Sequence, residues 1–440
     1  MKRLRVALLG CGNVGAALVD LLDEQRDAIV ARTGIDITVE RIAVRSTARQ
    51  RPVAVHPSVF TTDPLAAVED PDTDLVVEVI GGIEPARSLV TRAIELGKPV
   101  VTANKELLAN HGAELFAAAD AAGVDLLFEA AVAGGIPLVR PLRESLVGEP
   151  IRRIVGIVNG TTNYVLTKMS ESGADYAEAL AEAQRLGYAE RDPTADVEGF
   201  DAGAKAAIIA TIAFGAVVVA GDVYHEGISA VTAHDIETAR HLGHVIKAIA
   251  VVERTDDPAV TGPDEPPEVA VRVHPAMIPA THPLASVRDS FNAVFIEGDA
   301  VGELMLYGRG AGGRPTASAV LGDLIDAAVN VHNGGPGRIG RLARARIRPI
   351  DDLSCPYYLS LDVADRPGVL ARVADVLGRH GVSIRSMEQH GIGDDARLVF
   401  ITHRARERDV QDTLAALREL DAVHAVGTLM RVVGSDEDRG

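Results

Sequence analysis

A glycine-rich turn near the N-terminus constrains the fold of this chain more than any other feature. An apolar strand predicted over residues 5–9 leads into Gly10-Cys11-Gly12-Asn13-Val14-Gly15, and a helix is predicted over residues 16–25. Glycines at such a turn let the backbone approach a pyrophosphate, which then lies at the N-terminus of the helix. A plain tight turn is the alternative. The position of the turn between strand and helix favours dinucleotide binding by Gly10, Gly12, Asn13, Val14 and Gly15.

The elements that follow alternate between strand and helix, which predicts an α/β domain with a Rossmann-type parallel sheet. We expect this dinucleotide-binding domain to cover residues 1–132 and to be completed by about residues 305–330. The predicted strands are 5–9, 37–44, 75–80, 99–102 and 125–129, and the predicted helices are 16–25, 84–96 and 113–122.

Two features bear on the cofactor. The second predicted strand ends next to Arg45, where a site selective for NAD normally has an acidic residue on the ribose. An arginine there could meet a 2′-phosphate, so we expect NADP, with NAD possible; a solvated strand end is the alternative. A later glycine run around Gly310 precedes a predicted helix and could also cradle phosphate, or could be a plain flexible loop.

The segment from Gly187 to Lys205 combines acidic residues and turn formers, and it leads into an apolar helix. Asp201 and Lys205 lie one helical turn apart on that helix, where an (i, i+4) pair can meet. A carboxylate beside an ammonium at a buried helix end suits a small zwitterion or a proton, although a simple salt bridge at the helix start is the alternative. The chain otherwise prefers arginine, and its lysines are Lys2, Lys98, Lys105, Lys168, Lys205 and Lys247.

The rest of the chain predicts two further domains. Residues 133–304 form an α+β catalytic and dimerisation domain, in which we predict one continuous helix over 233–252. Residues 331–353 are Gly-, Pro- and Arg-rich in their first part and are expected to be a linker. Residues 354–433 have the strand–helix–strand–strand–helix–strand order of a ferredoxin-like sandwich. The polar end, 434–440, is expected to be disordered.

Composition excludes several classes of protein. At 440 residues the chain is too long for one compact core, which predicts two or three domains. A net charge of −18 without any basic run argues against a nucleic-acid partner. No apolar run is long enough to span a membrane. The two cysteines are far apart, which makes a disulfide framework improbable and a reducing cytoplasm the expected location. No zinc motif is present.

The motifs together resemble the homoserine dehydrogenase family. The match is Gly-Tyr-Ala-x-x-Asp-Pro-x-x-Asp-Val-x-Gly-x-Asp-x-x-x-Lys over residues 187–205, with Ala103-Asn104-Lys105 and Asn159-Gly160-Thr161-Thr162-Asn163 in the expected order. The resemblance covers residues 1–330, and Asp365 to Leu370 resembles an ACT domain, a metabolite-sensing module. The layout is that of the monofunctional enzymes. The resemblance implies reversible NAD(P)H-dependent conversion of L-aspartate 4-semialdehyde to L-homoserine, in the biosynthesis of threonine, methionine and isoleucine.

The resemblance also implies roles for individual residues. Lys205 would donate a proton, Asp201 would orient it, and Lys105 would bind and polarise the substrate and contact the cofactor; which lysine gives the proton stays open. The substrate-binding set would be Glu190 and Asp196, which meet the amino group, with Gly160, Thr161 and Tyr188. Gly160 and Gly310 would also contact the cofactor.

Three further expectations come from the resemblance. A monovalent cation such as Na⁺ would bind near the domain junction, mainly through backbone carbonyls, at Glu129, Val132, Gly134 and Ile136; a plain glycine-rich hinge is the alternative. L-Threonine would inhibit through the ACT domain, where the turn from Asp365 to Leu370 offers backbone N–H groups to a carboxylate. The alternative is a tail that only dimerises. A homodimer or homotetramer is expected.

Two other functions compete with this one. A different ACT-tailed dehydrogenase, such as a hydroxyacid dehydrogenase, would use a His–Glu pair, and the central motif contains no histidine. A non-catalytic amino-acid sensor on a Rossmann fold would not need Glu190, Asp201 and Lys205, so their presence counts against it.

Overall fold

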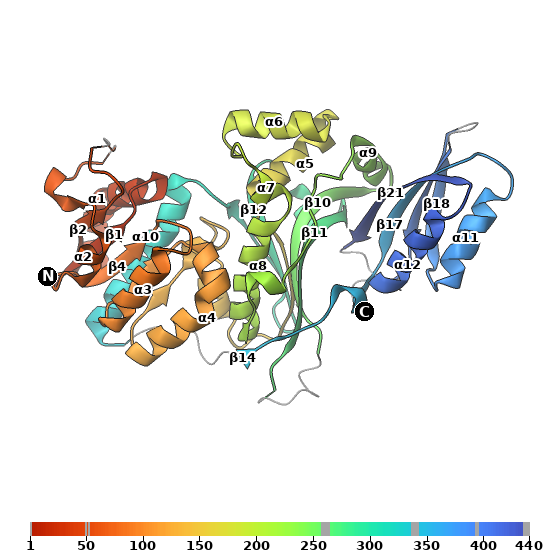
Figure 1. Cartoon of the computed structure of the whole chain (residues 1–440). Coiled ribbons are helices and arrows are strands. Elements are labelled where there is room, and N and C mark those ends of the chain that lie inside the picture. Colours follow the sequence, from red (N-terminus) through yellow and green to blue (C-terminus); the bar gives the residue numbers. More distant parts are fainter. Residues whose placement is uncertain are drawn as a thin grey trace.

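The computed structural model describes residues 2–48, 51, 53–256, 265–335, 343–391 and 396–433. Figure 1 shows an N-terminal part in red and orange that also contains the cyan helix α10, a central part in yellow and green, and a C-terminal part in blue. Short helical turns lie between the main elements at Pro57–Val59, Glu129–Ala131, Pro141–Ser145, Ala220–Asp222, Pro283–Ser286 and Ile350–Asp352.

The N-terminal part is a parallel sheet in the order β3-β2-β1-β4-β5-β6, as the alternating pattern predicts. Its strands are β1 (Lys2–Leu9), β2 (Ile35–Ala43), β3 (Phe60–Thr61), β4 (Leu75–Glu78), β5 (Val100–Thr102) and β6 (Leu126–Leu127). Its helices are α1 (Asn13–Thr33), α2 (Pro64–Glu69), α3 (Ala86–Glu95) and α4 (Lys105–Ala122).

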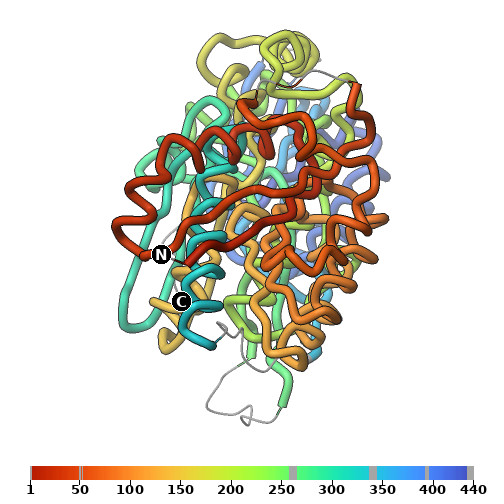
Figure 2. The backbone as a smooth tube through the Cα atoms, turned by 90° about the vertical axis from the view of Figure 1, so that its left-hand side faces the viewer, coloured from red at the N-terminus to blue at the C-terminus, as the bar shows by residue number. Residues whose placement is uncertain are grey.

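A helix from much later in the chain completes this part. Apolar residues of α1 and of α10 (Gly313–Asn333) pack on one face of the sheet, and α3 and α4 pack on the other. Figure 2 shows the cyan α10 beside the red N-terminal strands. Both faces of the sheet are therefore covered, as a parallel sheet requires.

The central part is an antiparallel sheet in the order β13-β12-β7-β10-β11. Its strands are β7 (Ile151–Ile157), β10 (His244–Arg254), β11 (Glu268–Pro279), β12 (Phe291–Gly298) and β13 (Gly302–Arg309), with short strands β8 (Ala216–Val217) and β9 (Tyr224–His225). Its helices are α5 (Gly160–Ser172), α6 (Tyr176–Leu186), α7 (Thr194–Val197), α8 (Phe200–Phe214) and α9 (Ala233–His241).

The predicted continuous helix over 233–252 is wrong in its second half. Helix α9 ends at His241, and Gly243 adopts a left-handed φ of 71° just before β10 begins. Glycine is the residue that takes this conformation without strain, so it ends the helix and turns the chain into the sheet. Val245, Ile249 and Val251 then pack on one face of that sheet.

Helix α8 connects the first two parts. Its apolar residues share one core with α4 of the N-terminal part and with strands of the central sheet. Helix α4 begins at Lys105 and α8 at Phe200, so this packing brings Lys105 close to Asp201 in the first turn of α8.

The C-terminal part confirms the ferredoxin-like order. Its sheet runs β21-β17-β19-β18, and β21 pairs with β11 through Arg431 and Val432, so it is continuous with the central sheet. Its elements are β16 (Ser354–Cys355), β17 (Tyr357–Val363), α11 (Val369–Arg379), β18 (Ile384–His390), β19 (Ala396–Thr402), β20 (Ala405–Arg406), α12 (Glu407–Arg418) and β21 (Val423–Val432).

The expected linker is only partly described. Residues 336–342 and the predicted disordered end, 434–440, lie outside the described residues. Within the described part of the linker, β14 (Ala343–Arg344) pairs with β8, and β15 (Arg346–Ile347) pairs with β11. The segment therefore runs along the central part before it enters the C-terminal one.

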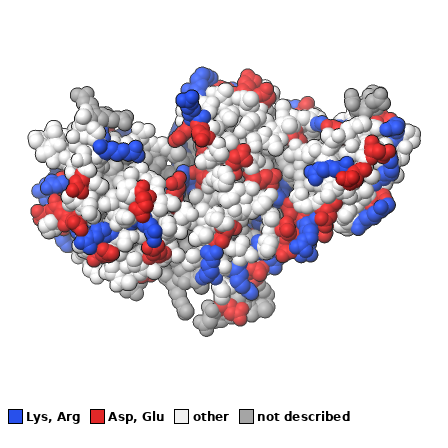
Figure 3. All heavy atoms as spheres, viewed as in Figure 1, with Lys and Arg blue, Asp and Glu red and all other residues white. Residues whose placement is uncertain are grey.

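The helices and the surface charges bear on the surroundings in which the protein works. None of the helices in the described ranges is long and apolar enough to cross a membrane. On the face shown in Figure 3, basic and acidic side chains are interspersed. The net charge of −18 is therefore not gathered into one patch on that face.

Candidate active site

The predicted glycine turn forms one wall of a cavity of about 710 Å³ at the carboxyl ends of β1, β2 and β4. Gly10 has a φ of 103°, and a side chain there would place its Cβ 2.8 Å from the Val79 carbonyl oxygen. A Cβ on Gly15 would lie 2.3 Å from the Gly10 oxygen. Only glycine permits this close approach of strand and helix. The N-terminus of α1, with Asn13 and Val14, follows Gly12 directly, which suits a pyrophosphate.

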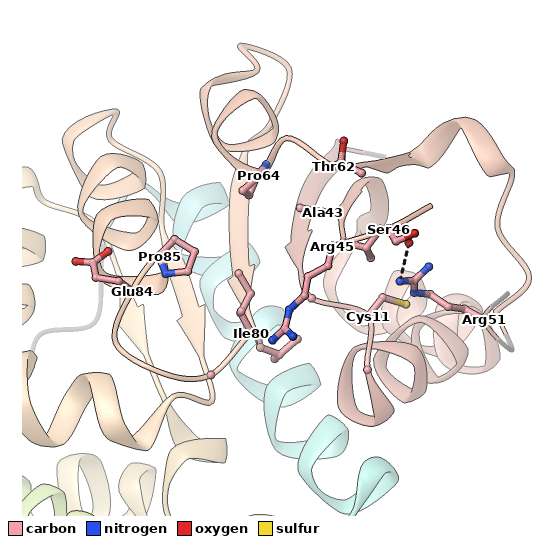
Figure 4. A pocket seen from close by; sticks show the side chains of 15 residues that line it. Cys11, Ala43, Arg45, Ser46, Arg51, Thr62, Pro64, Ile80, Glu84 and Pro85 are labelled. Carbon is pink, nitrogen blue, oxygen red and sulfur yellow. Dashed lines mark hydrogen bonds between the residues drawn. The ribbon is translucent and has the colours of Figure 1, made fainter. Parts of the chain in front are cut away.

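The wall of this cavity that follows β2 carries arginines. Arg45 and Ser46 line it beyond the end of β2, together with Arg51, whose guanidinium donates to the Ser46 carbonyl oxygen at 3.1 Å. Figure 4 shows these side chains around the cavity with Cys11 and Thr62. Two guanidinium groups where a ribose would lie suit a phosphate. Arg51 was missed from sequence because it lies beyond the expected strand end and in no motif.

Gly310 does not line this cavity. Its position is set by packing, because a Cβ there would lie 1.9 Å from the Asn292 amide, and a Cβ on Gly134 would lie 2.1 Å from the Gly310 oxygen. The glycine loop does adjoin the dinucleotide turn, since a Cβ on Gly313 would lie 3.1 Å from the Asn13 oxygen. The structure thus indicates close backbone packing as the reason for these glycines, and cofactor contact by Gly310 stays a prediction.

A short chain of contacts leads from the cavity to the predicted catalytic residues. Asn104 donates to the Gly82 carbonyl oxygen at 2.6 Å, next to the cavity wall, and its own side-chain oxygen caps α4 by accepting from Leu107 at 3.1 Å. Lys105 is the next residue. The cap therefore fixes the start of α4, and with it Lys105, relative to the loop that borders the cavity.

Asp201 lies at the centre of the candidate site. It is 8% exposed and accepts hydrogen bonds from the ammonium groups of Lys205, at 2.6 Å, and Lys105. Asn159 of the α5 cap donates to the same carboxylate at 2.9 Å, and Lys205 also donates to the Val158 carbonyl oxygen at 2.7 Å. The predicted Asp201–Lys205 pair is confirmed. It belongs to a buried network that also contains Lys105 and Asn159, and it is not a surface salt bridge.

The electrostatics follow from this geometry. Burial acts to raise the pKa of Asp201, but Lys205 and Lys105 outweigh it and hold that pKa well below its usual range. Burial likewise acts to lower the pKa of Lys105, and the attraction of Asp201 and then Asp196 raises it overall. The network therefore holds a charged carboxylate and a charged Lys105 at neutral pH.

The predicted substrate residues are only partly brought together. Asp196 accepts from Asn159 at 2.7 Å. The single proton of the Thr161 hydroxyl is shared between the Tyr188 carbonyl oxygen, at 2.5 Å, and Asp196, at 3.2 Å. Glu190 is exposed, and within the described chain its carboxylate is bonded to none of these groups. Sequence reasoning assigned no role to Asn159, although an asparagine at a helix cap next to the Gly160 motif was a usable signal.

The candidate cation site is a tight turn. Ala133 and Gly134 have left-handed φ values of 55° and 56°, and the carbonyl oxygens of Val132, Gly134 and Ile136 accept no hydrogen bond from any described residue. The Glu129 carboxylate is occupied by the backbone N–H groups of residues 138–140. Free carbonyls fit a monovalent cation; no group of side chains in the described residues could hold a metal ion.

The C-terminal part has its own cavity, of about 360 Å³, at the turn that the sequence singled out. It is lined by Asp365, Gly368, Leu370 and Gln389, and Gln389 donates to Asp365 at 3.1 Å. Gly368 has a φ of 89° and precedes α11, which has no side-chain cap. The first N–H groups of that helix therefore adjoin the cavity and suit a small carboxylate.

Comparison with known proteins agrees with these features. Family models match for the NAD-binding domain of homoserine dehydrogenase over residues 10–129, for homoserine dehydrogenase over 137–325 and for the ACT domain over 357–422. The homoserine dehydrogenase of Corynebacterium glutamicum is 50% identical over 97% of this chain and 95% of its own length. That of Mycobacterium tuberculosis H37Rv is 47% identical over 99% and 98%.

Solved structures give the same result. The crystal structure of a homoserine dehydrogenase from Thiobacillus denitrificans has a TM-score of 0.91, 41% identity and coverage of 98% of both chains. A hyperthermophilic archaeal homoserine dehydrogenase in complex with NADPH has a TM-score of 0.62 and 29% identity, and covers 74% of this chain and 98% of its own. With its NAD-binding, catalytic and ACT domains, the chain belongs to the homoserine dehydrogenase family.

Proposed function

We propose that the protein interconverts L-aspartate 4-semialdehyde and L-homoserine with a nicotinamide cofactor. The observation that carries the proposal is the pair of lysines bridged by buried Asp201. Asn104, the residue before Lys105, connects this pair to the dinucleotide cavity through its hydrogen bond to Gly82, next to Gly81 of the cavity wall. A reduced nicotinamide, when bound, supplies hydride to the aldehyde carbon. The substrate oxygen then needs a proton, and the chain offers two ammonium groups.

Each residue of the site has a separate role in the proposed reaction. Lys205 gives its proton to the substrate oxygen and is reprotonated from solvent, while Lys105 polarises the same oxygen. Asp201 orients both ammonium groups, because its two carboxylate oxygens each accept from one lysine. Asp196, held by Asn159 and Thr161, meets the substrate ammonium, and Glu190 and Tyr188 complete the pocket from the loop before α7.

A direct assay tests the proposal. Purified protein is mixed with L-homoserine and NADP⁺ or NAD⁺, and the reduced cofactor is followed by absorbance. Turnover is expected with at least one of them. No turnover with either cofactor in either direction would refute the enzymatic function, and retained threonine binding in such a protein would favour the amino-acid sensor.

We further propose that NADP is the preferred cofactor. Arg45 and Arg51 support this at the ribose end of the cavity, and a relative in this family was solved with NADPH. Arg45→Ala should raise the KM for NADP⁺ about tenfold through loss of a charged hydrogen bond, and leave the KM for NAD⁺ nearly unchanged.

Arg41→Ala is the matched control for that experiment, because Arg41 lies near the end of the same strand but pairs with Asp70 at 3.4 Å. Equal effects of Arg45→Ala on both cofactors would contradict recognition of a 2′-phosphate.

L-Threonine is proposed as an inhibitor that binds at the ACT cavity. Asp365→Ala should weaken inhibition about tenfold while kcat without threonine stays unchanged. Asp365 lines the cavity just before α11, and Figure 1 shows α11 well away from α8, the helix that carries Asp201. Inhibition is measured as the threonine concentration that halves the rate. Asp375→Ala, on the surface of α11 and paired with Arg379, is the control. A wild-type enzyme that threonine does not inhibit would leave the domain a role in dimerisation only.

The remaining proposals concern the surroundings of the site. Na⁺ or a similar monovalent cation binds at Glu129, Val132, Gly134 and Ile136. The carbonyl oxygens of Val132, Gly134 and Ile136 support this, because they accept no hydrogen bond from any described residue. A cytoplasmic location is supported by the two cysteines, which form no disulfide with each other in the described structure. A homodimer or homotetramer is proposed from the family, and light scattering after size exclusion measures it.

A further inference from the structure

Lys247 is a buried lysine that the proposed mechanism does not use. It lies on β10, is 4% exposed, and donates to the Asn163 side-chain oxygen at 3.0 Å and to the Val287 carbonyl oxygen. Both acceptors are neutral. A buried ammonium without a bonded carboxylate is costly, so its presence calls for a reason beyond packing.

Asn163 connects Lys247 to the loop formed by residues 287–291. Its side-chain NH₂ group donates to the carbonyl oxygens of Asp289, at 2.9 Å, and Phe291, at 3.1 Å, and lies 3.4 Å from that of Val287. The two side chains thus tie the first turn of α5 to the 287–291 loop. Asp289 has a left-handed φ of 53°, a strained conformation for a non-glycine residue, and the hydrogen bond to its carbonyl oxygen helps to hold it.

The 287–291 loop supports the active-site end of α5. A Cβ on Gly160 would lie 2.8 Å from the Ser290 oxygen, so Gly160 rests directly against the loop. Gly160 follows Asn159, which binds Asp196 and Asp201, and precedes Thr161, which binds Asp196. A displacement of the loop would therefore shift the turn that contacts both carboxylates.

We propose that Lys247 is a positioning residue, which acts through Asn163 and the 287–291 loop to fix the N-terminal turn of α5 against cofactor and substrate. The inference rests on the proposed function, because it assigns Gly160 and Thr161 to that site. Among the described residues, Lys247 itself is hydrogen-bonded to Asn163 and Val287 and to no member of the Asp201 network.

The charged groups around Lys247 are consistent with this role. Burial lowers the pKa of Lys247 to about 8, Arg288 also lowers it, and Glu171 of α5 and Asp289 of the loop raise it. Because the folded-state pKa lies below that of an unfolded lysine, the group opposes folding below pH 8, and this cost fades as the pH rises. Lys247→Met removes the free-energy cost of burying the ammonium together with its hydrogen bonds, and the two effects on stability oppose each other. The variant should therefore unfold at nearly the wild-type temperature at pH 7, although its kcat/KM falls.

The test compares kcat/KM and thermal unfolding for Lys247→Met, Asn163→Ala, the double variant and Lys247→Arg. We expect both single variants to lose about tenfold or more in kcat/KM, mainly in kcat, because small misplacements of binding groups are costly. The double variant should lose little more than the worse single one, since both break the same connection. Lys247→Arg should restore part of the rate.

Lys168→Met is the control, since Lys168 lies on α5, the helix of Asn163, and is a half-buried lysine that pairs with Glu182 at 2.9 Å. Wild-type kcat/KM in folded Lys247→Met would overturn the proposal; if that variant does not fold, Asn163→Ala decides in the same way. An inactive wild-type protein would instead refute the proposed function, so the two failures are distinguishable.

Discussion

Replacing Lys205 with alanine should lower kcat by about 10²–10⁴, which is what a positioned general acid contributes. The side chain is nearly buried, with 11% of its surface exposed, and two of its three protons are engaged by Asp201 and Val158. Its third proton is the one available to substrate. The KM for L-homoserine should change less than kcat, because the interaction develops in the transition state.

The measurement is the initial rate with L-homoserine and NADP⁺ over a range of pH, the direction in which the same amine takes the hydroxyl proton from the substrate. Lys168→Ala, at a half-buried lysine of α5 that pairs with Glu182, is the control and should keep its activity. Lys105→Ala in parallel identifies the proton donor, since the lysine whose loss removes a titration step from the kcat profile is the donor. A Lys205→Ala enzyme with near wild-type kcat would contradict the assigned role.

Replacing Asp201 with asparagine should lower both activity and stability. The change leaves two ammonium groups without their shared carboxylate, and removal of one partner of a buried ion pair costs about 3 kcal/mol or more. Because both lysines lose their orientation, kcat should fall at least as far as in Lys205→Ala. Urea unfolding at pH 7 measures the stability, with exposed Asp192→Asn as the control.

The stability effect should depend on pH in a defined direction. The pKa of Asp201 is depressed in the folded state, so its contribution to stability is fully present above the unfolded pKa, near 4. It is lost as the pH falls toward the folded-state value. The difference between wild type and Asp201→Asn should therefore be largest at neutral pH and shrink below pH 4. A difference that grows on acidification would contradict the assignment.

The parts of the site that were predictable from sequence are the local ones. The glycine turn has its own strand and helix on either side, and the Asp201–Lys205 pair needs only one helical turn. The arrival of Lys105 was not predictable from spacing, because it depends on α4 packing against α8 across 96 residues of sequence. The family resemblance named Lys105, and the packing explains why it meets Asp201.

The sequence-based predictions fail where tertiary packing determines the secondary structure or the role of a residue. The segment after Gly243 is apolar enough for a helix, but its alternate residues pack on opposite faces of a sheet. Asn159 has an ordinary cap sequence, and only the fold shows that its amide bridges Asp196 and Asp201. Lys247 likewise acquires a role only through a loop that lies 40 residues later.

The most direct test of the central claim is a crystal structure of the protein with NADP⁺ and L-homoserine. We expect the substrate hydroxyl to lie within hydrogen-bonding distance of the Lys205 or Lys105 ammonium, with the nicotinamide C4 facing the carbon that carries it. A substrate whose hydroxyl contacts neither lysine, or a nicotinamide that lies away from the Asp201 network, would contradict the account.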